Sequence, residues 1–172
     1  MSITVAKSAG FCFGVNRAIN IVNSLLDKNV KVSTLGPIIH NMEVVNELES
    51  RGCKAVDNID EVEKDATLVI RSHGVPKYVI DKLDENGVKY EDATCPFVKK
   101  IHNIVANPDN KDGIVLIAGN SVHPEVEGII GHCSTECHTF KNSEEIDEIY
   151  NNILKKNNKQ VFVVAQTTFC LL

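Results

Sequence analysis

Cys95 is a candidate reactive or metal-binding residue because it stands where a predicted strand passes into a predicted helix. Residues 88–93 are predicted to form the strand, and apolar residues from Phe97 to Val105 repeat at helical spacing. Pro96 takes a first-turn position, which tolerates proline. A thiol there faces unpaired backbone N–H groups and the positive end of the helix dipole, which favours the thiolate that binds metal or attacks a substrate. Taken alone, Cys95 could equally be a small buried residue in a turn.

The same arrangement recurs along the chain, each time with a chemically capable residue. Cys12 lies between Gly10 and Gly14, and glycine allows unusual backbone angles and close approach to a bulky group. This spacing suits a thiolate beside a cluster, although a glycine-rich turn around a core cysteine explains the motif equally well. The residues at predicted strand ends are Cys12, His40, His73, Cys95, His123 with Glu125, and Thr167 with Thr168.

The elements that must position these residues alternate between strand and helix. Strands are predicted at residues 3–7, 30–35, 53–56, 67–70, 88–93, 114–118 and 161–165. Helices are predicted after Cys12 (ending by 27–29) and at residues 42–50, 77–86, 97–105 and 143–155, the last capped by Ser143. Such alternation predicts an α/β fold with parallel βαβ units, in which ligands bind outside the carboxyl ends of the strands.

The polar segment 106–113 is rich in turn formers and is interpreted as the boundary region between two α/β units. The first unit is predicted to span residues 1–96, including the N-terminal strand and the Cys12 loop. The second is predicted to span residues 97–172 and to be incomplete at its C-terminal end.

Composition limits the classes of function. A net charge of -5, a pI near 5.7 and the lack of a basic run argue against nucleic-acid binding. No apolar run approaches a membrane span of about 20 residues, and the N-terminus has no signal-peptide profile. The six cysteines are scattered, which indicates a reducing, cytoplasmic environment.

Together these residues suggest a reduction of an anionic substrate. Cys12 and Cys95 can hold an iron–sulfur cluster, although a cuboidal cluster normally needs at least one more ligand. Three imidazoles beside helix N-termini suit a phosphate or a diphosphate. Glu125 could deliver a proton if burial favours its protonated form.

Two zinc sites compete with this interpretation. His132, Cys133, Cys137 and His138 have spacing that could bind zinc, but they lack a separated second pair, and their segment is expected to be a variable loop. A zinc hydrolase using His123, Glu125 and another histidine would leave the two turn cysteines without a role.

Six ordered motifs carry a resemblance to a known family. They are residues 6–15 (AKSAGFCFGV), 34–41 (TLGPIIHN), 71–76 (RSHGVP), 92–96 (DATCP), 123–128 (HPEVEG) and 166–168 (QTT). In these motifs the chain resembles the 4-hydroxy-3-methylbut-2-enyl diphosphate reductases, which finish the non-mevalonate isoprenoid pathway. The resemblance implies a trefoil of three related α/β units around a central 4Fe–4S cluster. It also implies reductive dehydroxylation of the substrate to isopentenyl and dimethylallyl diphosphates.

The resemblance implies a role for each matching residue. Cys12 and Cys95 would be cluster ligands, and His40, His73 and His123 would bind the diphosphate. The catalytic residues would be Glu125 as proton source, His123 close to the substrate hydroxyl, and Thr167 as its hydrogen-bond partner. The partners implied are the allylic diphosphate and an external electron donor such as a ferredoxin or flavodoxin.

The sequence departs from the family pattern at its end. The family's third cluster cysteine, a Ser-Ser-Asn diphosphate-binding segment and a later serine belong to a third unit that the 172 residues do not contain. The alternative expectation is therefore a truncated, inactive remnant that binds diphosphate weakly without a stable cluster.

Overall fold

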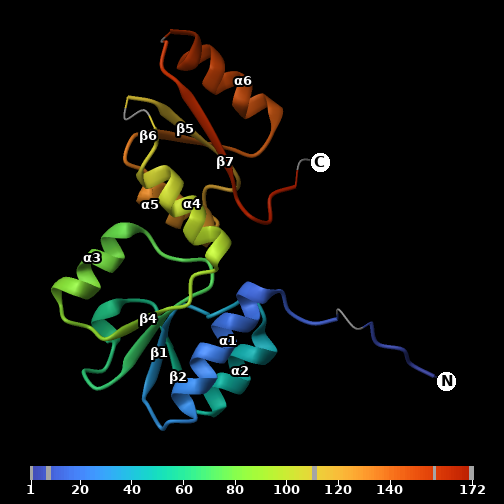
Figure 1. Ribbon diagram of the computed structural model, residues 1–172, viewed down its shortest axis with the longest axis vertical. Helices are drawn as coiled ribbons and strands as arrows, with labels where there is room; N and C mark the ends of the chain where they lie inside the picture. Colours follow the sequence, from blue (N-terminus) through green and yellow to red (C-terminus); the bar gives the residue numbers. More distant parts are fainter. Residues whose placement is uncertain (1, 7–8, 110–111, 157, 171–172) are drawn as a thin grey trace.

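Two parallel β-sheets form the framework of the computed structural model, which describes residues 2–6, 9–109, 112–156 and 158–170. Figure 1 shows them as two lobes, with the N-terminal segment extending away from the first lobe. The predicted α/β class is confirmed, and the two sheets fit two of the three units that the resemblance implies.

The first sheet has the strand order β2-β1-β3-β4, and all its pairs are parallel. Its strands are β1 (Val32–Leu35), β2 (Cys53–Val56), β3 (Thr67–Ile70) and β4 (Tyr90–Asp92). Its helices are α1 (Phe13–Leu26), α2 (Met42–Ser50) and α3 (Lys77–Glu85), with a 3-10 turn at Ile59–Glu61.

The second sheet has the order β6-β5-β7 and is also parallel. Its strands are β5 (Ile114–Ala118), β6 (Glu136–Phe140) and β7 (Val161–Ala165). The helices of this half are α4 (Pro96–Ala106), α5 (Pro124–His132) and α6 (Ser143–Asn152), followed by a 3-10 turn at Leu154–Lys156.

Strand β3 of the first sheet and strand β5 of the second are buried on both faces, as is usual in parallel sheets. In β3, Val69 packs with α1, whereas Leu68 and Ile70 pack on the α3 side. In β5, Val115 and Ile117 pack with α4 and α5, and the alternate residues pack with α6. The period-2 alternation therefore distributes each apolar run between two half-cores.

Helices α4 and α5 lie between the two lobes in Figure 1, and α5 also packs against α3. The contact is close, since a Cβ atom at Gly131 would overlap the Pro76 ring. His132 Nε2 lies 3.1 Å from the carbonyl oxygen of Val75 across the same junction. The two sheets are thus fixed through α5, while the division at residues 96 and 97 stays a prediction.

The structure corrects three expectations about secondary structure. Residues 2–6 form no strand, and Ile3 and Val5 are 90% and 73% exposed because no strand of the described chain pairs with them; Lys7 lies outside the described residues. The segment expected as a loop contains β6, which pairs with β5 along its whole length. Asn142, rather than Ser143, caps α6, because its extended backbone lets Oδ1 accept from the backbone N–H of Glu145.

The remaining differences are at element ends, where helices fray. Helix α3 ends one residue early, and α6 gives way to the 3-10 turn rather than running to Lys155. Among the helices of the described segments, none is long and apolar enough to span a bilayer.

Candidate functional site

Three histidines from three separate turns meet at one place. His40 follows β1, His73 follows β3, and His123 follows β5 in the other sheet. Their ring centroids are 4.4 Å apart for His40 and His73, 5.8 Å for His40 and His123, and 5.6 Å for His73 and His123. One ring nitrogen of each lies within 4.8 Å of the other two. The structure therefore brings together the three histidines expected at strand ends.

Local hydrogen bonds place each ring. Asn41 caps α2 by accepting from the backbone N–H of Val44 at 3.0 Å, which fixes His40 immediately before the helix. Gly74 has a φ of +74°, which L side chains rarely adopt, and it turns the chain directly after His73. His123 caps α5, because its Nδ1 accepts from the backbone N–H of Glu125 at 3.1 Å. A neutral His123 therefore carries its proton on Nε2.

The environment favours the uncharged form of two of the three imidazoles. The pKa of His73 is lowered to about 4, mainly by burial and to a smaller extent by repulsion from His40, His123 and Arg71. Burial also lowers the pKa of His123, against the opposing attraction of Glu125. His73 Nδ1 is buried and has no hydrogen-bond partner among the described residues. An unpartnered buried nitrogen is costly, so it can gain free energy from a ligand.

Arg71 adds a permanent cation that the sequence interpretation did not single out. Its side chain is half-buried, and its Nε donates to the carbonyl oxygen of Gly74 at 3.4 Å. Its Nη1 lies 3.1 Å from the position that a Cβ atom would take at Gly36. Arg71 lies two residues before His73 in the RSHG motif, which was the available signal. With one fixed cation and three donor-capable rings, the site suits an anion.

A hollow of about 170 Å³ opens beside His40 and His73. It is lined by Phe11, Val15, Ile39, His40, Asn41, Ser72 and His73. Phe11 precedes Cys12, so the Cys12 loop borders the histidine site.

Glu125 and Thr167 form a second polar pair, at the carboxyl ends of β5 and β7. Glu125 is only 2% exposed, although it carries a carboxyl group. Its Oε1 accepts from the backbone N–H of Thr167 at 2.6 Å, and its Oε2 accepts from Thr167 Oγ1 at 2.9 Å. Thr167 itself is exposed, so its hydroxyl connects the buried carboxyl with the surface.

The two predicted ligand cysteines each begin a helix. Cys12 is the N-cap of α1 and Cys95 is the N-cap of α4, and neither side chain bonds to its own helix. The turns meet, because a Cβ atom at Gly14 would stand 2.6 Å from Cys95 Sγ. Cys12 does not follow a strand as expected, since residues 2–6 form none, but it keeps the predicted place at a helix start.

Arg17 and Asp92 hold the Cys95 turn in place. Arg17 donates to the carbonyl oxygens of Asp92 and Thr94 at 3.1 Å and 3.3 Å. Asp92 accepts from the backbone N–H of Thr94 and from Lys99. Burial acts to raise the pKa of Asp92, but these hydrogen bonds outweigh it and the net pKa is lowered. Both residues support the thiol without touching it.

The fit of this donor set to an iron–sulfur cluster is good but partial. Two thiols stand at helix N-termini, and the Cys95 thiol lies directly against the bare backbone of Gly14. A cuboidal cluster takes Cys thiolates as ligands, and these two would supply part of its set.

The proposed zinc group at residues 132–138 is not assembled among the described residues. His132 Nε2 pairs with the carbonyl oxygen of Val75, and His132 stacks on the buried His102 with centroids 4.1 Å apart. His138 pairs instead with Glu136 at 3.0 Å. The two histidines are therefore engaged by partners other than the two cysteines.

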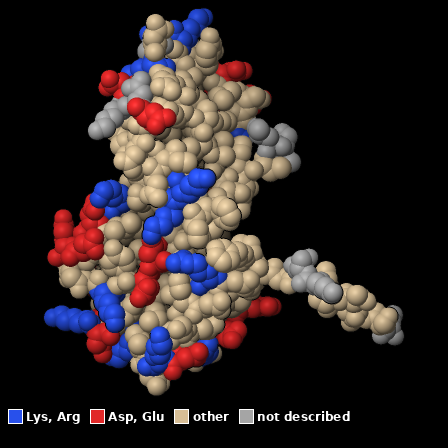
Figure 2. All heavy atoms as spheres, in the orientation of Figure 1, with Lys and Arg blue, Asp and Glu red and all other residues tan. Residues whose placement is uncertain are grey.

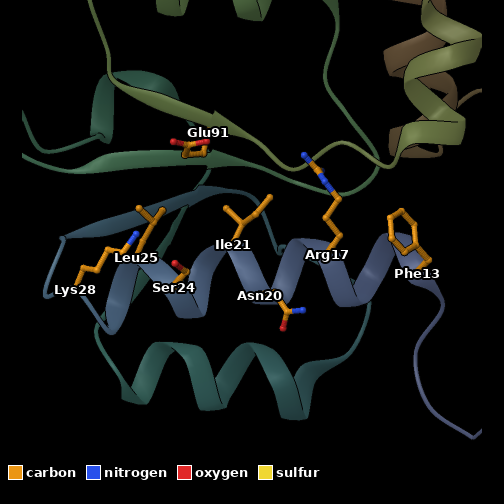
Figure 3. Close-up of a pocket in the computed structure, with 8 residues that line it drawn as sticks. All are labelled: Phe13, Arg17, Asn20, Ile21, Ser24, Leu25, Lys28 and Glu91. Carbon is orange, nitrogen blue, oxygen red and sulfur yellow. The ribbon is translucent and has the colours of Figure 1, made fainter.

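A hollow of about 480 Å³ runs along α1, away from the histidines. Figure 3 shows its lining residues Phe13, Arg17, Asn20, Ile21, Ser24, Leu25, Lys28 and Glu91. It contains none of the predicted site residues. Figure 2 shows side chains of both charge signs interspersed over the first lobe, so this face has no single-sign field.

Comparisons with known proteins identify the family of this chain. Residues 3–171 match the model of the family described as LytB protein. A protein of Clostridioides difficile named 4-hydroxy-3-methylbut-2-enyl diphosphate reductase is 40% identical over 98% of this chain and 59% of its own length. A protein of the same name from Alkaliphilus oremlandii is 42% identical over 98% of this chain and 58% of its own length.

Two solved structures are similar as well. A structure of (E)-4-hydroxy-3-methyl-but-2-enyl diphosphate reductase superposes with a TM-score of 0.80 at 38% identity, over 96% of this chain and 58% of that one. The Plasmodium falciparum reductase superposes with a TM-score of 0.83 at 30% identity, over 94% of this chain and 50% of that one. This chain thus spans between half and three-fifths of the length of these relatives.

Proposed function

Because this chain belongs to the LytB family, we propose that it provides the substrate-binding and proton-donating parts of a 4-hydroxy-3-methylbut-2-enyl diphosphate reductase. The observation that carries the proposal is the meeting of His40, His73 and His123, from two sheets, beside the Glu125–Thr167 pair. The family relationship supports the reaction, which is the reductive loss of an allylic hydroxyl to give isopentenyl and dimethylallyl diphosphates.

The three imidazoles and Arg71 would bind the diphosphate. Each neutral ring offers one N–H donor, and an anion beside the ring would favour its protonated form and add a charge-assisted bond. His40 and His123 stand at the N-termini of α2 and α5, whose unpaired N–H groups favour negative charge.

Cys12 and Cys95 would hold the iron–sulfur cluster, proposed as 4Fe–4S. When bound, it would supply the electrons for the reduction, received from an external donor such as a ferredoxin or flavodoxin. Gly14 lets the Cys95 thiol take its place against the start of α1, since a side chain at position 14 would displace it. Any further ligand would come from outside the two cysteine turns.

Glu125 would supply protons through Thr167. Losing the hydroxyl as water consumes two electrons and two protons, and one proton must reach the leaving oxygen. The Thr167 hydroxyl donates to Glu125 and belongs to an exposed residue, so it can relay a proton outward while the carboxyl stays buried. The His123 ring is fixed because its Nδ1 accepts from the backbone N–H of Glu125. Its Nε2–H is then free to orient the substrate hydroxyl.

Two alternative functions would give different metal contents. A remnant that binds diphosphate weakly would hold no stable cluster. A zinc site at the three imidazoles is suggested by their nitrogens, which lie within 4.8 Å of one another. The nearby Arg71 charge disfavours a dication there.

Anaerobic reconstitution with iron and sulfide tests the proposal. The proposal expects visible absorbance, an iron count that depends on both Cys12 and Cys95, and conversion of the hydroxymethylbutenyl diphosphate under a dye reductant. Cys12→Ser and Cys95→Ser should each remove the absorbance, and Cys53→Ser should not. Diphosphate binding without a cluster would favour the remnant, and purified protein that holds zinc without iron would favour the hydrolase.

A further inference from the structure

Cys133 and Cys137 form a thiol pair that the proposed reaction does not use. Cys133 is the C-cap of α5, and Cys137 is the second residue of β6. Both are half-buried against the apolar cluster that contains Val105, Ile129 and Val115. Since His132 and His138 have other partners, the thiols are left with each other rather than with a metal.

The two side chains interact with each other. The Cys133 and Cys137 sulfurs share one proton-donating contact, and Cys133 Sγ also lies 3.4 Å from the carbonyl oxygen of Ile129, so the single Cys133 S–H can point to either acceptor. The interaction with Cys133 is the largest cause of a pKa of about 7 for Cys137, with a smaller contribution from His138 and with burial acting against both. The same interaction and burial raise the pKa of Cys133. Cys137 is therefore the more readily ionised, nucleophilic sulfur of the pair, and Cys133 is the thiol that keeps its proton.

The intervening chain permits the two sulfurs to approach. Ser134 and Thr135 connect the helix to the strand as a short bend, tied to α4 by a bond from the Ser134 backbone N–H to the carbonyl oxygen of Val105. Strand β6 is at the edge of its sheet, so only β5 restrains Cys137 by strand pairing. A small shift of this edge is all that a bond between adjacent sulfurs requires.

We infer that Cys133 and Cys137 are a modification site, at which a hydroperoxide converts the two thiols into a reversible intramolecular disulfide. The Cys137 thiolate attacks the terminal peroxide oxygen, breaking the O–O bond and forming a sulfenic acid, while the leaving alkoxide or hydroxide takes up a proton. The Cys133 thiol, losing its proton, then attacks the Cys137 sulfur, forms the S–S bond and expels the oxygen as water. The thiols lose two electrons, and the peroxide gains them.

The sequence allows a clean test on the whole chain. Trypsin releases residues 112–141 as one peptide, because no Lys or Arg lies between Lys111 and Lys141, and Cys133 and Cys137 are its only cysteines. The protein is treated with hydrogen peroxide, quenched in acid, alkylated under denaturing conditions and analysed by mass spectrometry. The expected product is an unalkylated peptide two hydrogens lighter than the reduced one, which dithiothreitol returns to the doubly alkylated form. Cys53 is the internal control, because burial raises the pKa of its thiol to about 11 and it should remain alkylatable.

Two variants test the order of the steps. In Cys133→Ser, the Cys137 sulfenic acid has no resolving thiol and should be trapped by dimedone. In Cys137→Ser, the Cys133 thiol should show little dimedone labelling under the same conditions. The inference is overturned if the wild-type peptide stays doubly alkylated while Cys12 is oxidised, or if the two variants are labelled equally.

Discussion

Gly14 lies so close to the Cys95 thiol that a Cβ atom at position 14 would stand 2.6 Å from Cys95 Sγ. The contact joins the N-terminus of α1, where Cys12 stands, to the N-terminus of α4, where Cys95 stands. Two cysteines predicted to be ligands, separated by 82 intervening residues in the sequence, are thereby brought to one region, and a residue without a side chain lets the Cys95 thiol lie there.

Gly14→Ala should therefore weaken cluster binding without removing a ligand. The added methyl group would displace the Cys95 thiol, and iron retained after anaerobic reconstitution should fall at least severalfold. Asn20→Ala, an exposed position on the same helix, is the matched control and should retain iron as the parent does. Equal iron in both variants would show that no group needs the space beside Cys95.

The junction between the lobes depends on Gly74. Gly74 and Gly87 both have positive φ, +74° and +63°, but a Cβ atom would lie 2.7 Å from His102 Cε1 at Gly74 and meets nothing within 4 Å at Gly87. Each Gly→Ala change loses about 1 kcal/mol to backbone strain. Gly74→Ala should cost about 1–3 kcal/mol more, because it overpacks the junction. Urea unfolding of the two variants measures the difference, and equal free energies of unfolding would contradict the account.

Stability should fall as the solution becomes acidic, in part because of His102. Its pKa is lowered from 6.5 to about 4, mainly by burial, with smaller contributions from His132 and Lys99 that Asp92 opposes. Between these values the unfolded chain binds a proton that the folded chain does not, so stability is present above pH 6.5 and is lost as the pH falls toward 4. The loss from this residue is at most about 3 kcal/mol.

His102→Gln removes this titration, so the difference in unfolding free energy between neutral and mildly acidic pH should shrink. His138→Gln, at the edge strand β6, is the control and should keep the parent's dependence. If both variants respond to pH as the parent does, His102 is not a source of the acid sensitivity.

Much of the framework could be predicted from the sequence, because the short strands are continuous apolar runs with clear ends. Helix α2 and strands β2, β3, β5 and β7 have the predicted bounds. The N-terminal strand was wrong because alternating Ile3 and Val5 find no partner strand in the described chain. Strand β6 was missed because its Cys, His and Thr residues resemble a polar loop, and only pairing with β5 makes it a strand.

The site required more than local patterns. Each histidine could be placed at the end of a strand, but the contact between His40 and His123 depends on how α5 packs against α3. The burial of Glu125 and its two bonds to Thr167 also depend on the second sheet. Arg71 was overlooked because its one signal, its place two residues before His73 in the RSHG motif, is a weak one. The assigned roles of these residues stay predictions.

Glu125→Gln should reduce turnover while leaving substrate binding intact. Glutamine keeps the size and can still bond Thr167, but it cannot give up a proton as a carboxylic acid does. Loss of a general acid typically costs about 10²–10⁴-fold in kcat, with little change in KM. The assay uses the reconstituted enzyme or, if this chain alone does not turn over, a chimera with the remaining length of a curated relative.

Thr167→Val should lower kcat as well, because it removes the hydroxyl that links Glu125 to the surface. Thr168→Val is the matched control, since Thr168 accepts its bond from Gln166 instead. Turnover of Glu125→Gln within a few-fold of the parent would mean that the proton comes from another group.

Calorimetric titration with inorganic diphosphate, in the presence of a chelator, tests most directly the claim that His40, His73 and His123 form one anion site. The account predicts a single site whose affinity falls about tenfold or more, or by at least about 1.4 kcal/mol, in His73→Asn and in His123→Asn. The asparagine in the second variant preserves the cap of α5, so its loss of affinity would report on the ring rather than on the helix. His138→Asn should bind as the parent does. Binding that is unchanged in both site variants, or no binding to the parent, would contradict the account.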